Sequence, residues 1–293
     1  MVDRRDVVGT LKYVESDATV YRRFVSTGIE VNTFGFDDHD VPIRDGRPER
    51  DRLTLDTVGF TLLDHSSAVN DFYDEDEIRD IYTSEVIEAV KSAVGAQRVA
   101  SQGWTIRTSD AADVDAARKH GYRQGKGNVQ PPGTQVHIDA HANSADRLAK
   151  ALYDKHFPGG PEYSRFISFS LWRAFSDPPQ DWPLALCDAT SVRREEGLRN
   201  VLIFTEEVPP EELRREPIDG EALLPTAALF KFNPRHRWWY FPDMTRDEAL
   251  LFKFHDSRNP VTWGVPHAPF HDHAARNAHA RKSIEVRCTA YFD

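Results

Sequence analysis

The stretch RKSIEVRCTAYF, residues 281–292, decides the fold class of this 293-residue chain. Its polar and apolar residues alternate: Arg281, Ser283, Glu285 and Arg287 would share one face, and Ile284, Val286, Cys288, Ala290 and Phe292 the other. A period of two residues is typical of a β-strand with one polar and one apolar face. The stretch therefore predicts a strand that packs on its apolar side.

Further strand-like runs fill the chain from residue 98 onward. They are RVASQGWTIR (98–107), TQVHIDA (134–140), SRFISFSLWRAF (164–175), NVLIFTEEV (200–208), ALFKFNP (228–234), RWWYFP (237–242) and EALLFKFHDS (248–257). Turns rich in proline and glycine join these runs, and strands do not alternate with helices. This pattern favours a mainly β sandwich or barrel with helices packed outside it.

Two helical segments interrupt the strand pattern. Apolar residues recur every three to five positions between residues 71 and 94, and Gly95 can end that helix. A shorter helix is expected at 144–155, where Asn143 can cap the N-terminus. Because no repeat or linker divides the chain, we expect one domain over 1–293, with an N-terminal elaboration at 1–97 and the β core at 98–293.

The composition excludes several classes of protein. The chain has 47 acidic and 37 basic side chains and a formal net charge of −10, whereas a nucleic-acid binder would be basic. No apolar run approaches the roughly 20 residues that span a bilayer, and the first residues lack the apolar stretch of a signal peptide. We therefore expect a soluble, cytoplasmic protein without membrane partners. Only Cys187 and Cys288 are present, which excludes a disulfide scaffold and a cysteine-rich zinc site.

A candidate metal site begins with His137 and Asp139 in TQVHIDA. Residues i and i+2 of a strand point to the same face, so the imidazole and the carboxylate would converge. His267, in WGVPHAPFHD, is the best third ligand because its neighbours are strand-like; His271 and His273 are rivals in a polar, loop-like segment. Two histidines and one carboxylate leave open positions on Fe(II), whereas zinc more often closes its shell.

A candidate carboxylate clamp lies on the polar face of the stretch quoted first. Arg281 and Ser283 would stand side by side there, and the guanidinium fork can bind a carboxylate through two bonds. A 2-oxoacid could be held in this way by its distal carboxylate. The alternative is a surface arginine that pairs with Glu285, but the position of Arg281 after His267 on a neighbouring strand favours the clamp.

Arg173 stands out because alternation places it on the same face as apolar residues. Ile167, Phe169, Leu171 and Phe175 would share that face. An unpaired charge among them is costly, so the guanidinium either pairs for structural reasons or meets an anion in a pocket. We consider Arg173 and its neighbour Trp172 as candidate substrate contacts.

Several other polar residues have roles that the residues alone leave open. The aromatic run from residue 232 to 254 is more typical of a core than of a substrate wall. Within or beside it, His236 and His255 are candidates for a supporting role at the metal site. Asp188 and Asp256 could orient a ligating imidazole by hydrogen bonding.

Together these motifs resemble the iron and 2-oxoglutarate-dependent oxygenases typified by the gibberellin GA4 desaturase and the small component of the cephem 7α-methoxylase. The resemblance rests on LTLDTVGFTLLDHSSAVNDFYDEDEI, VHID, LWRAF, PLALCDATSV, YFPDMTRDEALLFKFHDS, PHAPF and RKSIEVR. It implies a double-stranded β-helix (jelly roll) in which His137, Asp139 and His267 hold Fe(II), and Arg281 and Ser283 hold 2-oxoglutarate.

The resemblance also implies a reaction. With O2, such an enzyme hydroxylates or desaturates an unactivated C–H bond of a small specialised metabolite and releases succinate and CO2; a carboxylate or amino-acid-derived substrate would suit Arg173. The chain departs from the family at Ser170, Ala174 and His255, where Asn, Pro and Tyr are usual. Those departures do not affect the expected metal ligands, but they leave the substrate undefined.

Two other kinds of protein remain as alternatives. A cupin-like enzyme could use zinc or manganese without oxidation, and it would not need Arg281. A non-catalytic barrel could bind a small molecule, but it would have no use for a complete set of metal ligands.

Overall fold

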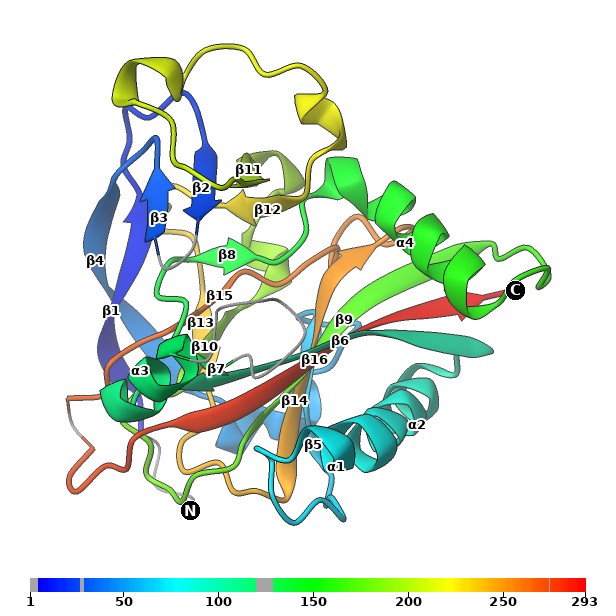
Figure 1. The fold of residues 1–293 in the computed structure, drawn as a ribbon. Coiled ribbons are helices and arrows are strands. Elements are labelled where there is room, and N and C mark those ends of the chain that lie inside the picture. The colour runs from blue at the N-terminus through cyan, green and yellow to red at the C-terminus, as the bar shows by residue number, and fades with distance from the viewer. Residues whose placement is uncertain (1–4, 27–28, 120–128, 274) are drawn as a thin grey trace.

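The strands form two sheets in the computed structural model, which describes residues 5–26, 29–119, 129–273 and 275–293 (Figure 1). In this described part, the larger sheet has the order β1 (Val7–Val14), β4 (Phe36–Asp45), β13 (Trp238–Tyr240), β10 (Leu184–Cys187), β15 (His267–Pro269), β8 (His137–Ile138), β12 (Thr226–Leu229), β11 (Leu198–Phe204), β2 (Arg22–Ser26) and β3 (Ile29–Asn32). The smaller sheet has the order β5 (Phe60–Asp64), β14 (Glu248–Asp256), β9 (Arg165–Ala174), β16 (Lys282–Phe292), β6 (Arg98–Thr108) and β7 (Val129–Gln130). The expectation of a mainly β chain is confirmed.

The stretch at 281–292 forms β16, which pairs antiparallel with β6 and with β9. Its two faces have different surroundings. Ile284 and Val286 pack in an apolar cluster with residues of the helical segment before β6, whereas Ser283 and Glu285 lie in register with Ala174 and Trp172, which belong to the core between the sheets. Both faces are therefore covered, and the polar one points into the barrel.

The helices lie outside the sheets. They are α1 (Glu75–Glu77), the π-helical turn η2 (Ile78–Tyr82), α2 (Thr83–Val94), α3 (Ala111–Lys119) and α4 (Ala142–His156), and Figure 1 shows α1 and α2 beside the smaller sheet. Gly95 ends α2 in the left-handed conformation, with φ of 66°, as a glycine does at low cost. The short 3-10 turns are η1 (Arg47–Arg52), η3 (Ala189–Ser191), η4 (Arg194–Glu196), η5 (Glu211–Leu213) and η6 (Glu221–Leu223).

Two details of the helices differ from the prediction. The N-cap of α4 is His141, whose side chain accepts a hydrogen bond from the backbone N–H of Asn143, so Asn143 is not the cap. Helix α3 was not expected, because its sequence is polar and short. The strands of the N-terminal segment lie at the ends of the two sheets, with β1 and β3 as the outermost strands of the larger sheet and β5 at an edge of the smaller one.

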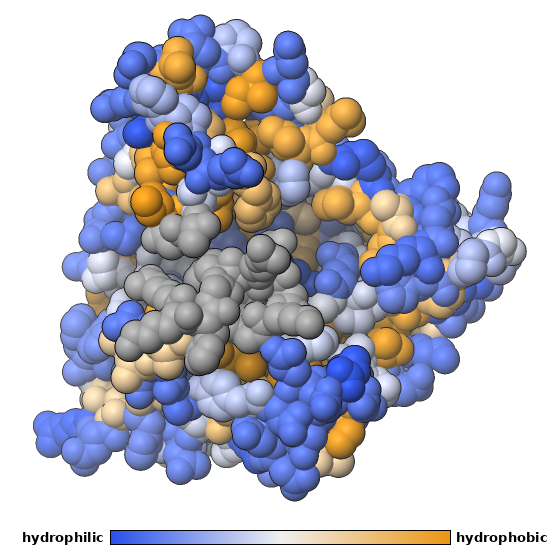
Figure 2. Space-filling view, in the orientation of Figure 1, coloured by the Kyte–Doolittle hydropathy of each residue, from blue (hydrophilic) through white to orange (hydrophobic). Residues whose placement is uncertain are grey.

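The surface is mainly hydrophilic on the face drawn in Figure 2, with apolar side chains gathered over β2, β11 and β12. Phe204, at the end of β11, and Leu223, in η6, are among the exposed large apolar residues. Within the described residues, no helix combines the length and apolar character needed to cross a bilayer.

Candidate metal centre

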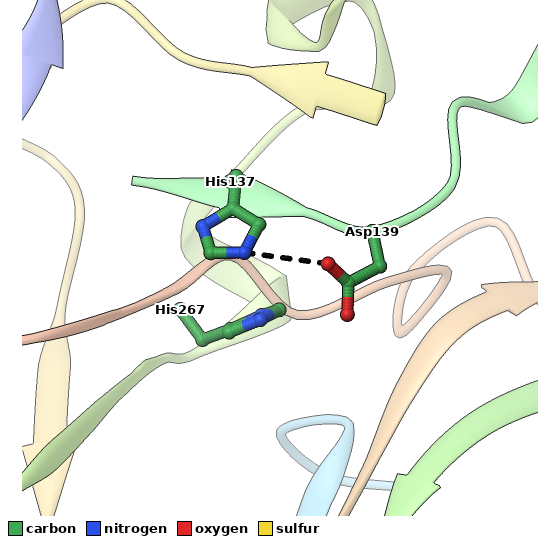
Figure 3. A group of neighbouring side chains, drawn as sticks. All are labelled: His137, Asp139 and His267. Carbon is green, nitrogen blue, oxygen red and sulfur yellow. Dashed lines mark ion pairs between the residues drawn. The ribbon is translucent and has the colours of Figure 1, made fainter. Parts of the chain in front are cut away.

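The structure brings His137, Asp139 and His267 together on one face of the larger sheet. His137 lies on β8 and pairs directly across the strands with His267 on β15, and Asp139 follows β8 by one residue (Figure 3). One potential ligand atom from each residue lies within 4.8 Å of the others. Figure 3 shows the three side chains pointing toward one another, from segments distant in sequence.

Backbone carbonyl groups fix the tautomer of both imidazoles. The Nδ1 atom of His137 lies 2.7 Å from the carbonyl oxygen of Gln135, and that of His267 lies 3.1 Å from the carbonyl oxygen of Val265. A carbonyl oxygen can only accept, so Nδ1 carries the proton and donates in each ring. Each Nε2 therefore presents a lone pair, as a metal ligand must.

Burial and neighbouring charges shift the pKa values of His267 and Asp139. Burial, followed by the positive field of His137, lowers the pKa of His267 to about 3. Burial alone would raise the pKa of Asp139, but Arg287 and the two imidazoles outweigh it and hold that pKa well below its usual value. His267 is therefore neutral and Asp139 is charged near neutral pH.

This donor set fits a divalent iron. Two imidazoles and one carboxylate on one face form the arrangement that leaves positions free on Fe(II), and thiolates, which would favour zinc, do not take part. Phe252 and Phe254 pack against the ring of His267, at 4.9 Å and 5.9 Å between ring centroids, and restrict its rotation. The side chains of His137 and Asp139 keep 12% and 13% of their surface exposed, so the site is open on one side.

Arg281 directly precedes β16 and is a buried cation without an anionic partner in the described part of the chain. Its residue is 1% exposed, and only Nη1 has a hydrogen-bond acceptor, the carbonyl oxygen of Trp182 at 3.3 Å. Nε and Nη2 have no partner, and no carboxylate among the described residues forms an ion pair with this guanidinium. Burial, followed by the charge of Arg107, lowers its pKa to about 9. A buried, unpaired guanidinium is costly, so this environment favours an anionic ligand.

Ser283 and Trp172 complete the surroundings of Arg281. Ser283 is buried on the inward face of β16, where its hydroxyl donates to the carbonyl oxygen of Arg107 at 3.4 Å. The ring centroid of Trp172 lies 5.8 Å from Cζ of Arg281, so the indole packs against the guanidinium. Trp172 therefore faces the barrel interior.

Arg173 faces the opposite side of the same strand, and its predicted contact with substrate is wrong. Its Nε donates to the hydroxyl of Tyr82 at 3.1 Å, and its other nitrogens contact the carbonyl oxygen of Arg246 and the ring of His65. The guanidinium also lies over the rings of Phe72 and Tyr82. Alternate residues of a strand point to opposite faces, so Arg173 lies on the outer face of β9 whereas Trp172 lies on the inner one. The contacts of Arg173 thus connect the outer face of β9 to the helical layer.

His236, His255, His271 and His273 do not belong to the three converging side chains. His271 and His273 are exposed and contact each other in a loop. His236 bridges Tyr13 and Glu196, at 3.1 Å from each. His255 stacks on Phe166, and burial and the charge of Arg194 lower its pKa to about 4.

The two aspartates expected to orient a ligating imidazole do not do so. Asp188 caps η3 and pairs with Arg237, and Asp256 pairs with Arg165 and Lys253. The carbonyl groups before His137 and His267 perform that task instead.

Sequence reasoning also missed Arg287, which pairs with Asp139. The only signal for Arg287 in the sequence was its place on the polar face of the stretch at 281–292.

Comparisons with known proteins agree with this site. A family model described as "Oxidoreductase/YMDC permease-like domain" matches residues 11–291. "Hydroxylase/desaturase CTB9" of Cercospora beticola is 30% identical, over 88% of this chain and 78% of the relative. "Fe(II)/2-oxoglutarate-dependent dioxygenase nvfI" of Aspergillus novofumigatus is 27% identical, over 92% of this chain and 90% of the relative.

A solved structure shows the same fold. The "iron and alpha-ketoglutarate-dependent endoperoxidase NvfI" superposes with a TM-score of 0.76 at 22% identity, over 98% of both chains. This confirms the expected jelly-roll core. The chain therefore belongs to this oxidoreductase family and, with relatives that include the "Gibberellin cluster GA4 desaturase" of Gibberella fujikuroi, to the non-haem iron and 2-oxoglutarate-dependent dioxygenases.

Proposed function

We propose that this dioxygenase hydroxylates or desaturates an unactivated C–H bond of a small specialised metabolite and releases succinate and CO2. The observation that carries the proposal is that one barrel contains two separate features. His137, Asp139 and His267 converge as a set of candidate metal ligands, and Arg281 is a buried cation that forms no ion pair with a described residue. Relatives named hydroxylase/desaturase support this type of reaction.

In this proposal each group has a separate task. Nε2 of His137, Nε2 of His267 and a carboxylate oxygen of Asp139 hold Fe(II). Arg281 and Ser283 bind the distal carboxylate of 2-oxoglutarate, and Trp172 walls the pocket and is a candidate to touch the substrate as well. Bound iron, together with the co-substrate and O2, supplies the oxidising power that removes hydrogen from the C–H bond.

The protein contributes orientation and a shielded pocket. The carbonyl groups of Gln135 and Val265 hold the imidazoles in the ligating tautomer, and Phe252 and Phe254 shield His267 from water. The guanidinium of Arg281 fixes the far end of a five-carbon diacid, which limits how its other end can approach the metal. We further propose that the described parts of the chain work as one oxygenase domain.

The structure gives no support for a carboxylate on the substrate. That expectation rested on Arg173, which is bonded to protein groups on the outer face of β9. We therefore propose a substrate defined by its apolar carbon skeleton rather than by a charged group. Trp172 and the apolar residues of the barrel core suit such a skeleton.

An anaerobic titration tests the proposal. Fe(II) is added to the protein, followed by 2-oxoglutarate, and the visible spectrum is recorded. We expect a weak charge-transfer band that needs both additions and is lost in Arg281→Gln at the same co-substrate concentration. A metal-binding protein that gives no such band would contradict the proposal and favour the non-oxidative cupin-like alternative.

A further inference from the structure

Arg287 holds one oxygen of the carboxylate of Asp139. Its Nε lies 3.2 Å from Oδ2, whereas Oδ1 lies 3.4 Å from Nε2 of His137. The two oxygens therefore have different neighbours, a guanidinium on one side and a ligating imidazole on the other. Nε and Oδ2 lack the alignment of a hydrogen bond, so the contact is an ion pair.

Glu285 fixes the other end of Arg287. Nη2 of Arg287 donates to Oε1 of Glu285 at 2.8 Å, and the same oxygen lies 3.5 Å from Nη2 of Arg107. Arg287 thus has two carboxylate partners, while Arg281, which directly precedes the same strand, pairs with no carboxylate of the described residues. This difference separates their tasks, because a guanidinium already paired on both sides is not free to bind a co-substrate.

The local fold aims Arg287 at the metal centre. The register between β16 and β6 shifts between Arg287 and Cys288, and such a bulge turns a side chain away from its regular direction. The residues in register with Arg287 are Gly103 on β6 and Ser170 on β9, both small. Gly103 has a φ of 108°, which side-chain-bearing residues rarely adopt. The guanidinium therefore has room on both sides.

We propose that Arg287 is a positioning residue that makes Asp139 offer a single oxygen to the metal. The inference rests on the proposed function. A carboxylate that turned both oxygens to the metal would occupy one more coordination position. The site needs its remaining positions for the chelating co-substrate and for O2, so the second oxygen has to be held elsewhere.

The test counts the water molecules bound to Mn(II) in the protein without co-substrate, by deuterium spin-echo spectroscopy in D2O. Arg287→Met removes the cation and keeps an apolar chain of similar length. We expect this variant to carry one fewer metal-bound water than the unaltered protein, because Oδ2 of Asp139 takes that place. Arg287→Lys retains a positive charge and should restore the original count.

Arg165→Met is the matched control. Arg165 lies on the adjacent strand β9 and pairs with Asp256 at 2.6 Å, so its loss breaks an Arg–Asp pair of similar kind outside the metal centre. The water count should not change in this variant. If Arg287→Met does not fold, Arg287→Gln replaces it with the same expectation.

The outcomes separate this inference from the proposed function. An unchanged water count in Arg287→Met overturns the inference, since Arg287 then does not select the oxygen. A folded variant that no longer binds Mn(II) also overturns it, because Arg287 would then be needed to keep Asp139 within reach. Failure of the unaltered protein to bind Mn(II) would instead contradict the proposed function.

Discussion

At the scale of single residues, the metal centre depends on hydrogen bonds of the backbone rather than of acidic side chains. Each imidazole of the candidate metal centre donates Nδ1–H to a carbonyl group two residues earlier in the chain. The same stretch of backbone therefore carries the ligand and sets its tautomer. No acidic side chain is needed to orient these imidazoles, because the carbonyl groups accept from Nδ1. Asp139 is the only carboxylate among the three converging side chains.

The first prediction concerns His267. His267→Ala should raise the Kd for Fe(II), measured by anaerobic titration, by more than about 100-fold, since loss of a ligand should exceed the loss of a supporting hydrogen bond. His271→Ala is the control, because His271 is exposed and outside the converging group. Equal iron binding in His267→Ala and the unaltered protein would contradict the assignment.

The second prediction concerns Arg281. Arg281→Lys should raise the KM for 2-oxoglutarate by about 10- to 100-fold, which corresponds to the loss of one charge-assisted hydrogen bond. A lysine keeps the charge but cannot form the two parallel bonds of a guanidinium. Binding of Mn(II) without co-substrate should stay the same, and a KM equal to that of the unaltered protein would remove Arg281 from the co-substrate site.

At the scale of elements, strands with long alternating patterns could be predicted from the sequence. β9, β14 and β16 agree with their predicted ranges because each is long and apolar at every second position. The candidate ligands His137 and Asp139 could be proposed from the sequence because they are two residues apart in a strand-like run, although β8 itself consists of two residues. Its conformation depends on its neighbours in the sheet.

The faces of the strands could not be assigned from the sequence. Every residue of β9 from 166 to 174 is buried, since one face lines the barrel and the other packs under α2. A pattern of two buried faces does not say which is inside, so the sequence could not decide whether Arg173 pairs for structural reasons or meets an anion in a pocket. The roles of Arg287 and Arg107 depend on the pairing of β16 with β6, which is a contact between distant segments.

The third prediction concerns Arg173 as a structural residue. Arg173→Met should lower the free energy of unfolding by about 3 kcal/mol, because it removes hydrogen bonds from a buried charged donor and leaves their acceptors unpaired. Urea unfolding measures this change. Mn(II) binding and the KM for 2-oxoglutarate should stay close to those of the unaltered protein, and a selective loss of turnover at full stability would restore a role in substrate binding.

At the scale of the whole molecule, the fold favours the neutral state of several histidines. The pKa values of His65, His141, His156, His236, His255 and His267 are all lowered, with burial as the largest cause in each. In the unfolded chain these groups return to the ordinary pKa of about 6.5. Folding therefore releases protons that these imidazoles carry in the unfolded chain.

The fourth prediction is that acid weakens the metal-free protein before its carboxylates titrate. Below about pH 6.5 the unfolded chain binds protons that the folded chain excludes, so stability is fully present above that pH and is lost as the pH falls toward the lowered values. His255, with its pKa of about 4, should contribute about 1.4 kcal/mol per pH unit between roughly pH 6 and 5. Urea unfolding at pH 7, 6 and 5 measures this slope. His255→Gln should make it shallower by that amount. A slope in His255→Gln equal to that of the unaltered protein would show that His255 takes up its proton in the folded state as readily as in the unfolded chain.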